Sequence, residues 1–74
     1  MEDLKMAFDY TTIRDSRGVI IGRIRTDNNG NKAVFDARDH MIGRYNKASD
    51  ITIDMTGNIV ARGDNCGLLI SLNR

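Results

Sequence analysis

The chain has 74 residues, of which 41% are hydrophobic, and eleven Lys and Arg against ten Asp and Glu give a net charge of +1. This size fits a single domain over residues 1–74 with a small core, and the near-neutral charge argues against bulk binding to nucleic acid or to an anionic membrane. No run of about 18 apolar residues occurs, so no membrane-spanning helix is expected. The first residues lack the apolar stretch of a signal peptide and one cysteine cannot form an internal disulfide, so we expect a cytoplasmic protein.

Hairpins are the predicted elements, and Gly, Asn and Asp mark their turns because proline is absent. Residues 7–14 are rich in β-branched and aromatic side chains, and the DSRG tetrad that follows has the residues preferred in a type I turn. After a return strand over residues 19–25, Asn29-Gly30 predicts a type I′ turn. Further strands are expected over residues 32–36, 41–46, 51–54 and 58–62.

The segment after Gly63 differs from the hairpins. Residues 66–72, CGLLISL, do not alternate, and Asp64 or Asn65 can cap a helix. We therefore expect either one or two helical turns laid over an open end of the sheet or a seventh strand, and the end of the repeat phrase favours the helix. Residues 2–8, EDLKMAF, are either a short helical turn or an arm.

One phrase recurs three times: an Asp, a turn residue three places on, a small residue four further, and then Arg. It reads DSRGVIIGR from Asp15, DARDHMIGR from Asp36 and DMTGNIVAR from Asp54. Such a repeat indicates one supersecondary unit used several times. The predicted fold class is all-β: an antiparallel meander of five to six short strands from three hairpin repeats, with a short C-terminal cap.

The phrase D-x-x-G-x-x-[IV]-G-R, followed by a DN-type turn, resembles that of small uncharacterised bacterial and prophage-borne proteins built from degenerate β-hairpin repeats. It is also distantly similar to hairpin repeats of the WG and YD kind. The resemblance covers residues 10–63, but the chain lacks the tryptophan of WG repeats and has Asp39 and Ala61 where the phrase has Gly. It implies a fold and no site residue.

Strict alternation along the repeat strands divides their side chains between two faces. One face is wholly apolar or small and is the expected core. It comprises Ile20, Gly22, Ile24, Met41, Gly43, Tyr45, Ile59 and Ala61. Gly or Ala at one repeat position indicates a close approach to the backbone, by an aromatic ring of a neighbouring strand or by the matching face of a second copy.

The opposite face is expected to be mixed, with an aliphatic row beside the repeat arginines. The row consists of Ile21, Ile42 and Val60. Aliphatic side chains on a wetted face imply partial cover, which an internal curl of the sheet, the C-terminal segment or a partner subunit can supply. We predict a homo-oligomer with this row as its contact.

Arginine at one repeat position suits an anion or a partner protein, because the guanidinium group is planar, permanently charged and a bidentate donor. Alternatively, these arginines pair with the turn Asp residues of the repeat. The candidate partner or anion contacts are Arg23, Arg25, Arg44, Arg62 and Tyr45.

No catalytic or metal-binding pattern is found, so we expect no enzyme, no catalytic residue, no metal ion and no cofactor. His40 is the single histidine, whereas zinc needs three or four ligands. DNNGNK has Gly30 in fourth place, where a calcium-binding EF-hand loop needs Gly in sixth. Cys66 is expected to be a buried small apolar residue, with a reactive thiol or an intermolecular disulfide as the alternative.

The expected function is that of a non-enzymatic protein-binding module, such as a bacterial or phage-borne inhibitor or adaptor, that acts as a homo-oligomer. The alternative is a protein that binds nucleic acid or small anions through its repeated arginines. Phe8 and Phe35 are expected in the core, which leaves Tyr10 and Tyr45 as aromatic platforms for a single strand.

Overall fold

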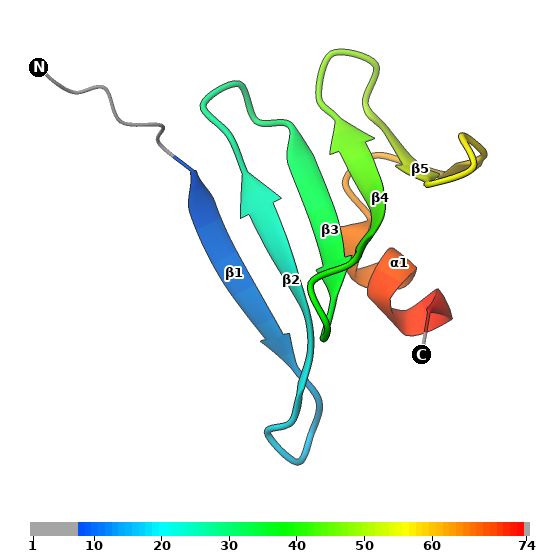
Figure 1. Cartoon of the computed structure of the whole chain (residues 1–74). Coiled ribbons are helices and arrows are strands. Elements are labelled where there is room, and N and C mark those ends of the chain that lie inside the picture. The colour runs from blue at the N-terminus through cyan, green and yellow to red at the C-terminus, as the bar shows by residue number, and fades with distance from the viewer. Residues whose placement is uncertain (1–7, 74) are drawn as a thin grey trace, which may run out of the picture.

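The computed structural model describes residues 8–73, which form a six-stranded antiparallel sheet and one helix (Figure 1). The elements are β1 (Asp9–Arg14), β2 (Ile20–Thr26), β3 (Lys32–Asp36), β4 (Met41–Asn46), β5 (Ile51–Asp54), β6 (Ile59–Arg62) and α1 (Cys66–Leu72). Each strand pairs with the next along the chain, so the predicted meander is confirmed. The helical alternative for the cap is also confirmed. Most of the expected N-terminal turn or arm, residues 2–7, lies outside the described residues.

Four of the five connections between strands are the same Asp-initiated turn. In each, the Asp donates its N–H to the carbonyl four residues on and accepts with its own carbonyl from the N–H three residues on, at 2.9–3.2 Å. The Asp Oδ1 also accepts the backbone N–H groups two and four residues on, at 2.8–3.0 Å. The initiating residues are Asp15, Asp27, Asp36 and Asp54.

Only the fourth residue of each turn has a positive φ: 85° at Gly18, 85° at Gly30, 67° at Asp39 and 90° at Gly57. A turn closed by this hydrogen bond with no positive φ at either central residue is type I, and a left-handed residue after it completes a three-residue hairpin loop. The type I′ turn predicted at Asn29-Gly30 is therefore wrong. The turn unit occurs four times, once more than the repeat phrase indicates.

A β-bulge in each repeat places the aliphatic row on the core side of the sheet, and not on the opposite side as predicted. The register shifts by one residue between β1 and β2, between β3 and β4, and between β5 and β6. The residues left over are Ile21, Ile42 and Val60, and all three pack against the core cluster. Strict alternation fails at a bulge, so the prediction that this row faces away from the core is wrong.

The same bulges move three predicted core residues outward, the first being Ile20, which is paired with the exposed Arg14. Met41 is paired with Phe35, and Ile59, which is 63% exposed, is paired with Ile53. Cross-strand pairs share a face, so Met41 and Ile59 lie on the side of the sheet opposite the core. The other side keeps Gly22, Gly43 and Tyr45 from the predicted core face.

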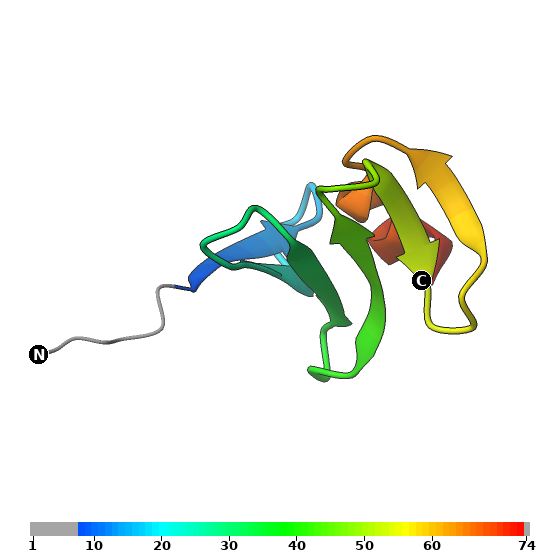
Figure 2. The ribbon, with the colours of Figure 1, turned by 90° about the horizontal axis from the view of Figure 1, so that it is seen from above.

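Helix α1 packs in the curl of the sheet, as the view from above shows (Figure 2). Its buried residues Cys66, Leu69 and Ile70 form the core with Val34 and Tyr45. The C-terminal segment is therefore the cover for the aliphatic row, which is one of the three sources predicted. Since α1 supplies this cover within one chain, the row does not need a partner subunit to bury it.

The repeat glycines lie directly beneath the helix. A Cβ added to Gly22 would come within 2.8 Å of the Ile70 side chain, and one added to Gly43 within 2.6 Å of the Leu69 side chain. The predicted close approach to the backbone is confirmed at these two positions. The approaching group is the helix, and not the aromatic ring or second copy that was expected.

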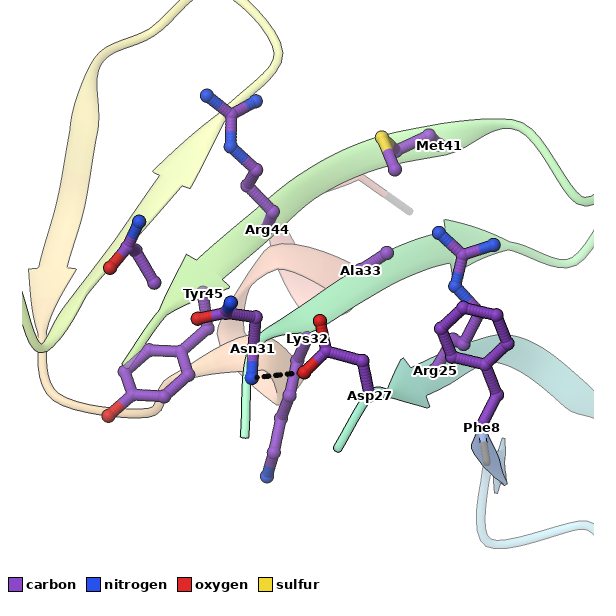
Figure 3. Close-up of a pocket in the computed structure, with 10 residues that line it drawn as sticks. Phe8, Arg25, Asp27, Asn31, Lys32, Ala33, Met41, Arg44 and Tyr45 are labelled. Carbon is purple, nitrogen blue, oxygen red and sulfur yellow. Dashed lines mark hydrogen bonds between the residues drawn. The ribbon is translucent and has the colours of Figure 1, made fainter. Parts of the chain in front are cut away.

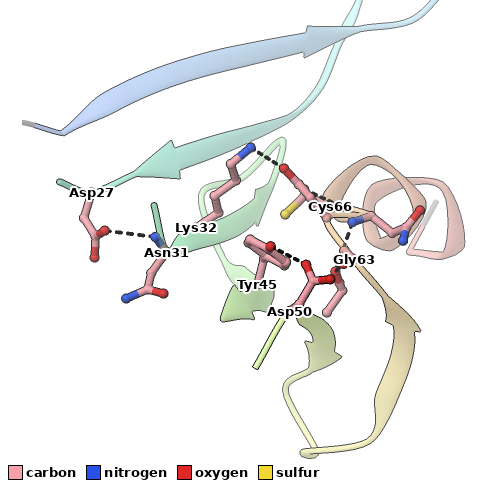
Figure 4. A network of polar contacts seen from close by, with 10 residues as sticks. Asp27, Asn31, Lys32, Tyr45, Asp50, Gly63 and Cys66 are labelled. Atoms are coloured by element: carbon pink, nitrogen blue, oxygen red, sulfur yellow. Dashed lines mark hydrogen bonds and ion pairs between the residues drawn. The ribbon is translucent and has the colours of Figure 1, made fainter. Parts of the chain in front are cut away.

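A buried hydroxyl holds the loop that leads into α1 (Figure 4). Thr52 is fully buried; its Oγ1 donates to the Gly63 carbonyl at 2.7 Å and accepts the Asn65 N–H at 3.0 Å. Asn65 occupies the N-cap position, and its side-chain amide donates to the Arg62 carbonyl at 2.7 Å. These contacts start the helix against the sheet.

Candidate binding face

The side of the sheet opposite α1, here called the open face, combines arginines with aromatic and aliphatic side chains. Cross-strand pairing places its residues in rows. One row runs Tyr10, Arg25, Ala33, Arg44, Ile53 and Ile59, a second runs Thr12, Arg23, Phe35 and Met41, and a third includes Ile51 and Arg62. Within residues 8–73, no helix or strand covers this face.

The structure brings together four of the five predicted contact residues. Arg23, Arg25, Arg44 and Arg62 all lie on the open face. Tyr45 does not, because its ring is buried against the core cluster. Its hydroxyl donates to Oδ1 of Asp50 at 2.6 Å, and this hydrogen bond, with burial, raises the pKa of Tyr45 to about 12.

Two phenylalanines that were expected in the core lie instead beside an arginine of the open face. The Arg25 guanidinium carbon is 4.8 Å from the Phe8 ring centroid and 5.4 Å from that of Phe35, both within cation–π range. The core prediction for Phe8 and Phe35 is wrong. The signal that could have placed Phe35 is the length of the turn from Asp27, which sets Arg23 opposite Phe35.

Two hollows adjoin Arg25 on this face. The first, of about 280 Å³, is lined by Phe8, Arg25, Met41 and Arg44, with Tyr45 and Asp27 also in its lining (Figure 3). The second, of about 450 Å³, is lined by Arg25, Phe35, Tyr10, Thr12, Arg23 and Asp39. Apolar walls beside guanidinium groups can accommodate a planar or acidic group of a ligand.

Each hollow has one carboxylate in its lining, Asp27 in the first and Asp39 in the second. Within residues 8–73, Arg23 forms an ion pair with Asp39 at 2.6 Å, whereas Arg25, Arg44 and Arg62 form none. The expected pairing of the repeat arginines with turn Asp residues therefore holds only for Arg23. The other three guanidinium groups are available to a ligand.

The turn carboxylates are occupied by their own loops. Hydrogen bonds, that from the His40 N–H foremost, hold the pKa of Asp36 below its usual value. The Thr56 hydroxyl, followed by the Asn58 N–H, lowers the pKa of Asp54 in the same way. Such carboxylates stabilise turns and are poor candidates for acid–base chemistry near neutral pH.

A second polar network closes one end of the core (Figure 4). Lys32 forms an ion pair with Asp64; partial burial acts to raise the pKa of Asp64, but the hydrogen bonds from Lys32 and Cys66 lower it on balance. Cys66 is only 2% exposed, and burial, followed by its contact with Asp64, raises the pKa of its thiol to about 12. The predicted burial of Cys66 is confirmed, and its thiol is protonated at neutral pH.

His40 is exposed in its turn, where Nδ1 lies 3.7 Å from Oδ2 of Asp36. Among residues 8–73, no three His, Cys, Asp or Glu side chains are grouped so as to hold a metal ion. The single helix in that range is too short to cross a membrane. Comparison with known protein families, with curated proteins and with solved structures gives no match.

Proposed function

We propose that this chain is a non-enzymatic protein-binding module, such as a bacterial or phage-borne inhibitor or adaptor, that acts as a homo-oligomer and binds its partner through the open face. One observation carries the proposal: Arg25, Arg44 and Arg62 have no carboxylate partner within residues 8–73 and lie among exposed apolar groups. Arginine and aromatic side chains are enriched at the centres of protein interfaces.

The partner is expected to present acidic side chains beside apolar ones. Acidic side chains of a partner laid across the hollow would meet Arg25 and Arg44, which line it with Phe8 and Met41. Because Phe8 and Phe35 hold the Arg25 side chain, little side-chain entropy is lost on binding. A rigid sheet further reduces the cost of ordering.

The test is capture of the partner from the native host, followed by measurement with the purified pair. We expect Arg44→Ala and Arg25→Ala each to weaken binding by about tenfold or more, since truncation of a central arginine commonly has effects of that size. Arg17→Ala is the matched control, because Arg17 is an exposed turn residue away from the open face. Equal loss of binding in all three variants, or in none, would contradict the proposal.

A second candidate is binding of single-stranded nucleic acid or another polyanion. The observation that favours it is the Arg25 guanidinium between two aromatic rings, with Tyr10 61% exposed on the same face. Aromatic platforms beside cations are typical of single-strand binding. Anisotropy with a labelled oligonucleotide should then show binding at about 50 mM salt that weakens at about 200 mM and in Arg44→Ala. No binding at the lower salt would eliminate this function.

A further inference from the structure

The backbone N–H and C=O groups on the outer side of the edge strand β1 pair with no other strand within residues 8–73. All of its residues except Ile13 are exposed, and it contains no proline, lysine or bulged residue that would block pairing. Figure 1 shows β1 at the free side of the sheet. The opposite edge, β6, has only four residues and carries the bulged Val60. The two edges are therefore unequal, and β1 is the one open to another strand.

Hydrogen-bond parity identifies which β1 residues face outward. The Asp15 N–H donates to the Val19 carbonyl at 2.9 Å, which closes the β1–β2 hairpin. Bonded and non-bonded pairs alternate along an antiparallel ladder, and the bulge between these strands lies on β2. It follows that Ile13, Thr11 and Asp9 direct their backbone groups toward β2. The backbone groups of the other three β1 residues point outward; these are Tyr10, Thr12 and Arg14.

We propose that β1 pairs with β1 of a second copy of this chain, antiparallel and centred on Thr12, to give a homodimer with one continuous sheet. A twofold axis perpendicular to the sheet through Thr12, the middle outward-facing residue, pairs all three outward-facing residues of β1 with outward-facing residues of the second copy. In this register Thr12 pairs with the partner's Thr12, and Tyr10 with the partner's Arg14. Each such pair exchanges two backbone hydrogen bonds.

The central side chains of β1 suit this self-pairing, while at its ends Asp9 lies opposite the partner's Asp15, whose carboxylate also accepts hydrogen bonds within its own turn. Tyr10 and Arg14 have no like-charged neighbour in the register, and a guanidinium group can stack on a tyrosine ring. Tyr10 is exposed, so it is free to receive the partner's Arg14. Because the axis is perpendicular to the sheet, both open faces lie on the same side of the dimer. The inference rests on the homo-oligomer in the proposed function but not on capture of another protein.

Light scattering and sedimentation from about 10 to about 500 µM should show a monomer–dimer equilibrium, because an edge contact buries less area than a standard stable interface. Thr12→Pro removes an outward N–H that β2 does not use, a place where an edge strand tolerates proline. We expect this variant to be monomeric with an unchanged circular dichroism spectrum. Thr12→Val, which keeps the N–H, should still dimerise.

Two further variants decide the matter if Thr12→Pro does not fold. Tyr10→Arg places like charges opposite each other and should yield monomers, and the double variant Tyr10→Arg with Arg14→Glu should restore the dimer. Thr12→Cys should form a disulfide with its own copy, since the bonded pair has Cα atoms about 5.5 Å apart. Thr11→Cys, on the other face of the strand, should not.

A wild-type monomer across the whole concentration range would overturn the inference. So would a dimer that survives both Thr12→Pro and Tyr10→Arg, or a Thr11→Cys disulfide in place of the Thr12→Cys one. A dimer lost only in Ile42→Asp would return the contact to the aliphatic row Ile21, Ile42 and Val60, which stays a prediction. If a monomeric Thr12→Pro variant still captures a partner protein, binding through the open face does not depend on the dimer. The dimer and the binding function can then fail independently of each other.

Discussion

Gly43 lets helix α1 pack closely on the sheet because glycine has no Cβ. An added Cβ would lie 2.5 Å from the Ile53 carbonyl oxygen and 2.6 Å from Leu69 Cδ1. The carbonyl belongs to the neighbouring strand and cannot move without disturbing the β4–β5 ladder. In the third copy of the repeat the same position is Ala61, which is only partly buried. A methyl group is accepted there and not beneath the helix.

Gly43→Ala should therefore destabilise the fold by about 2 kcal/mol or more, because overpacking forces backbone shifts. Urea unfolding followed by circular dichroism measures the change. Ala61→Gly is the matched control at the equivalent repeat position, and we expect it to cost only about 0.5–1 kcal/mol, the usual penalty of Gly in a strand. Wild-type stability in Gly43→Ala would show that α1 does not sit on this residue.

The turns show how an element is specified almost entirely by one side chain. Each initiating Asp satisfies two N–H groups of its own loop, so the loop needs little from the rest of the fold. The fourth position needs a left-handed residue, and three of the four turns use Gly. Asp39 is the exception, with φ at 67°.

Asp39→Gly should stabilise the protein by up to about 1 kcal/mol, because a left-handed conformation is unfavourable for a residue with a Cβ. The ion pair with Arg23 is lost, but exposed pairs contribute only about 0–1 kcal/mol. Asp39→Asn keeps the tolerance for this conformation while removing the charge, so its melting temperature should isolate the ion-pair effect. A lower melting temperature for Asp39→Gly than for Asp39→Asn would contradict this account.

The elements could be predicted closely from the sequence because their signals are local. Gly18, Gly30 and Gly57 follow an Asp at a fixed distance, and the observed strand bounds differ from the expected ones by at most two residues. The end of the repeat phrase before Cys66 correctly favoured a helix. The bulges could not be read this way, because one extra residue in a strand leaves no mark on composition.

The candidate site was predictable only in part for the same reason. Three arginines of the open face, Arg23, Arg44 and Arg62, were found from their repeat position, and the register confirms that they share a face. Strict alternation along β4 predicts that Ile42 and Tyr45 lie on opposite faces of the sheet. Because of the bulge, both lie on the core side: Tyr45 belongs to the core cluster and Ile42 packs against it. Phe8 and Phe35 were misplaced because aromatic content alone does not distinguish a core ring from one that stacks on an arginine.

At the scale of the whole molecule, a net charge of +1 conceals an uneven surface. The turn Asp residues use their carboxylates within the loops, while Arg25, Arg44 and Arg62 form no ion pair within residues 8–73. Sequence-level charge therefore understates the attraction of this face for acidic groups. Screening by salt should weaken any partner that depends on it.

Alkaline pH should destabilise the whole fold. The folded-state pKa of Cys66, raised from its usual value of 9.0 to about 12, exceeds that of the unfolded chain, so the unfolded state loses its proton first. The contribution of the Cys66 thiol to the free energy of unfolding is fully present below pH 9. It falls by about 1.4 kcal/mol for each pH unit above 9 until the pH reaches the folded-state pKa. Tyr45, also raised to about 12, acts in the same direction.

Urea midpoints between pH 7 and pH 11 test this expectation. Cys66→Ala should be less stable at pH 7, because it leaves a small void, but should show a shallower alkaline decline, since only Tyr45 then contributes. In the wild type, a thiol reagent should react no faster than the chain unfolds, because the thiol is buried. An equally steep decline in Cys66→Ala would contradict the assignment.

The order of the meander has a consequence for biosynthesis. Every strand pairs with its neighbour in the chain, whereas the residues that complete the core, Cys66, Leu69 and Ile70, follow all six strands. Since a chain emerges from the ribosome in order, the hairpins of the sheet can form one after another before α1 is available to cover the apolar side. During that interval the nascent chain exposes an apolar surface that is buried in the folded protein, and this is the stage at which a chaperone would bind it.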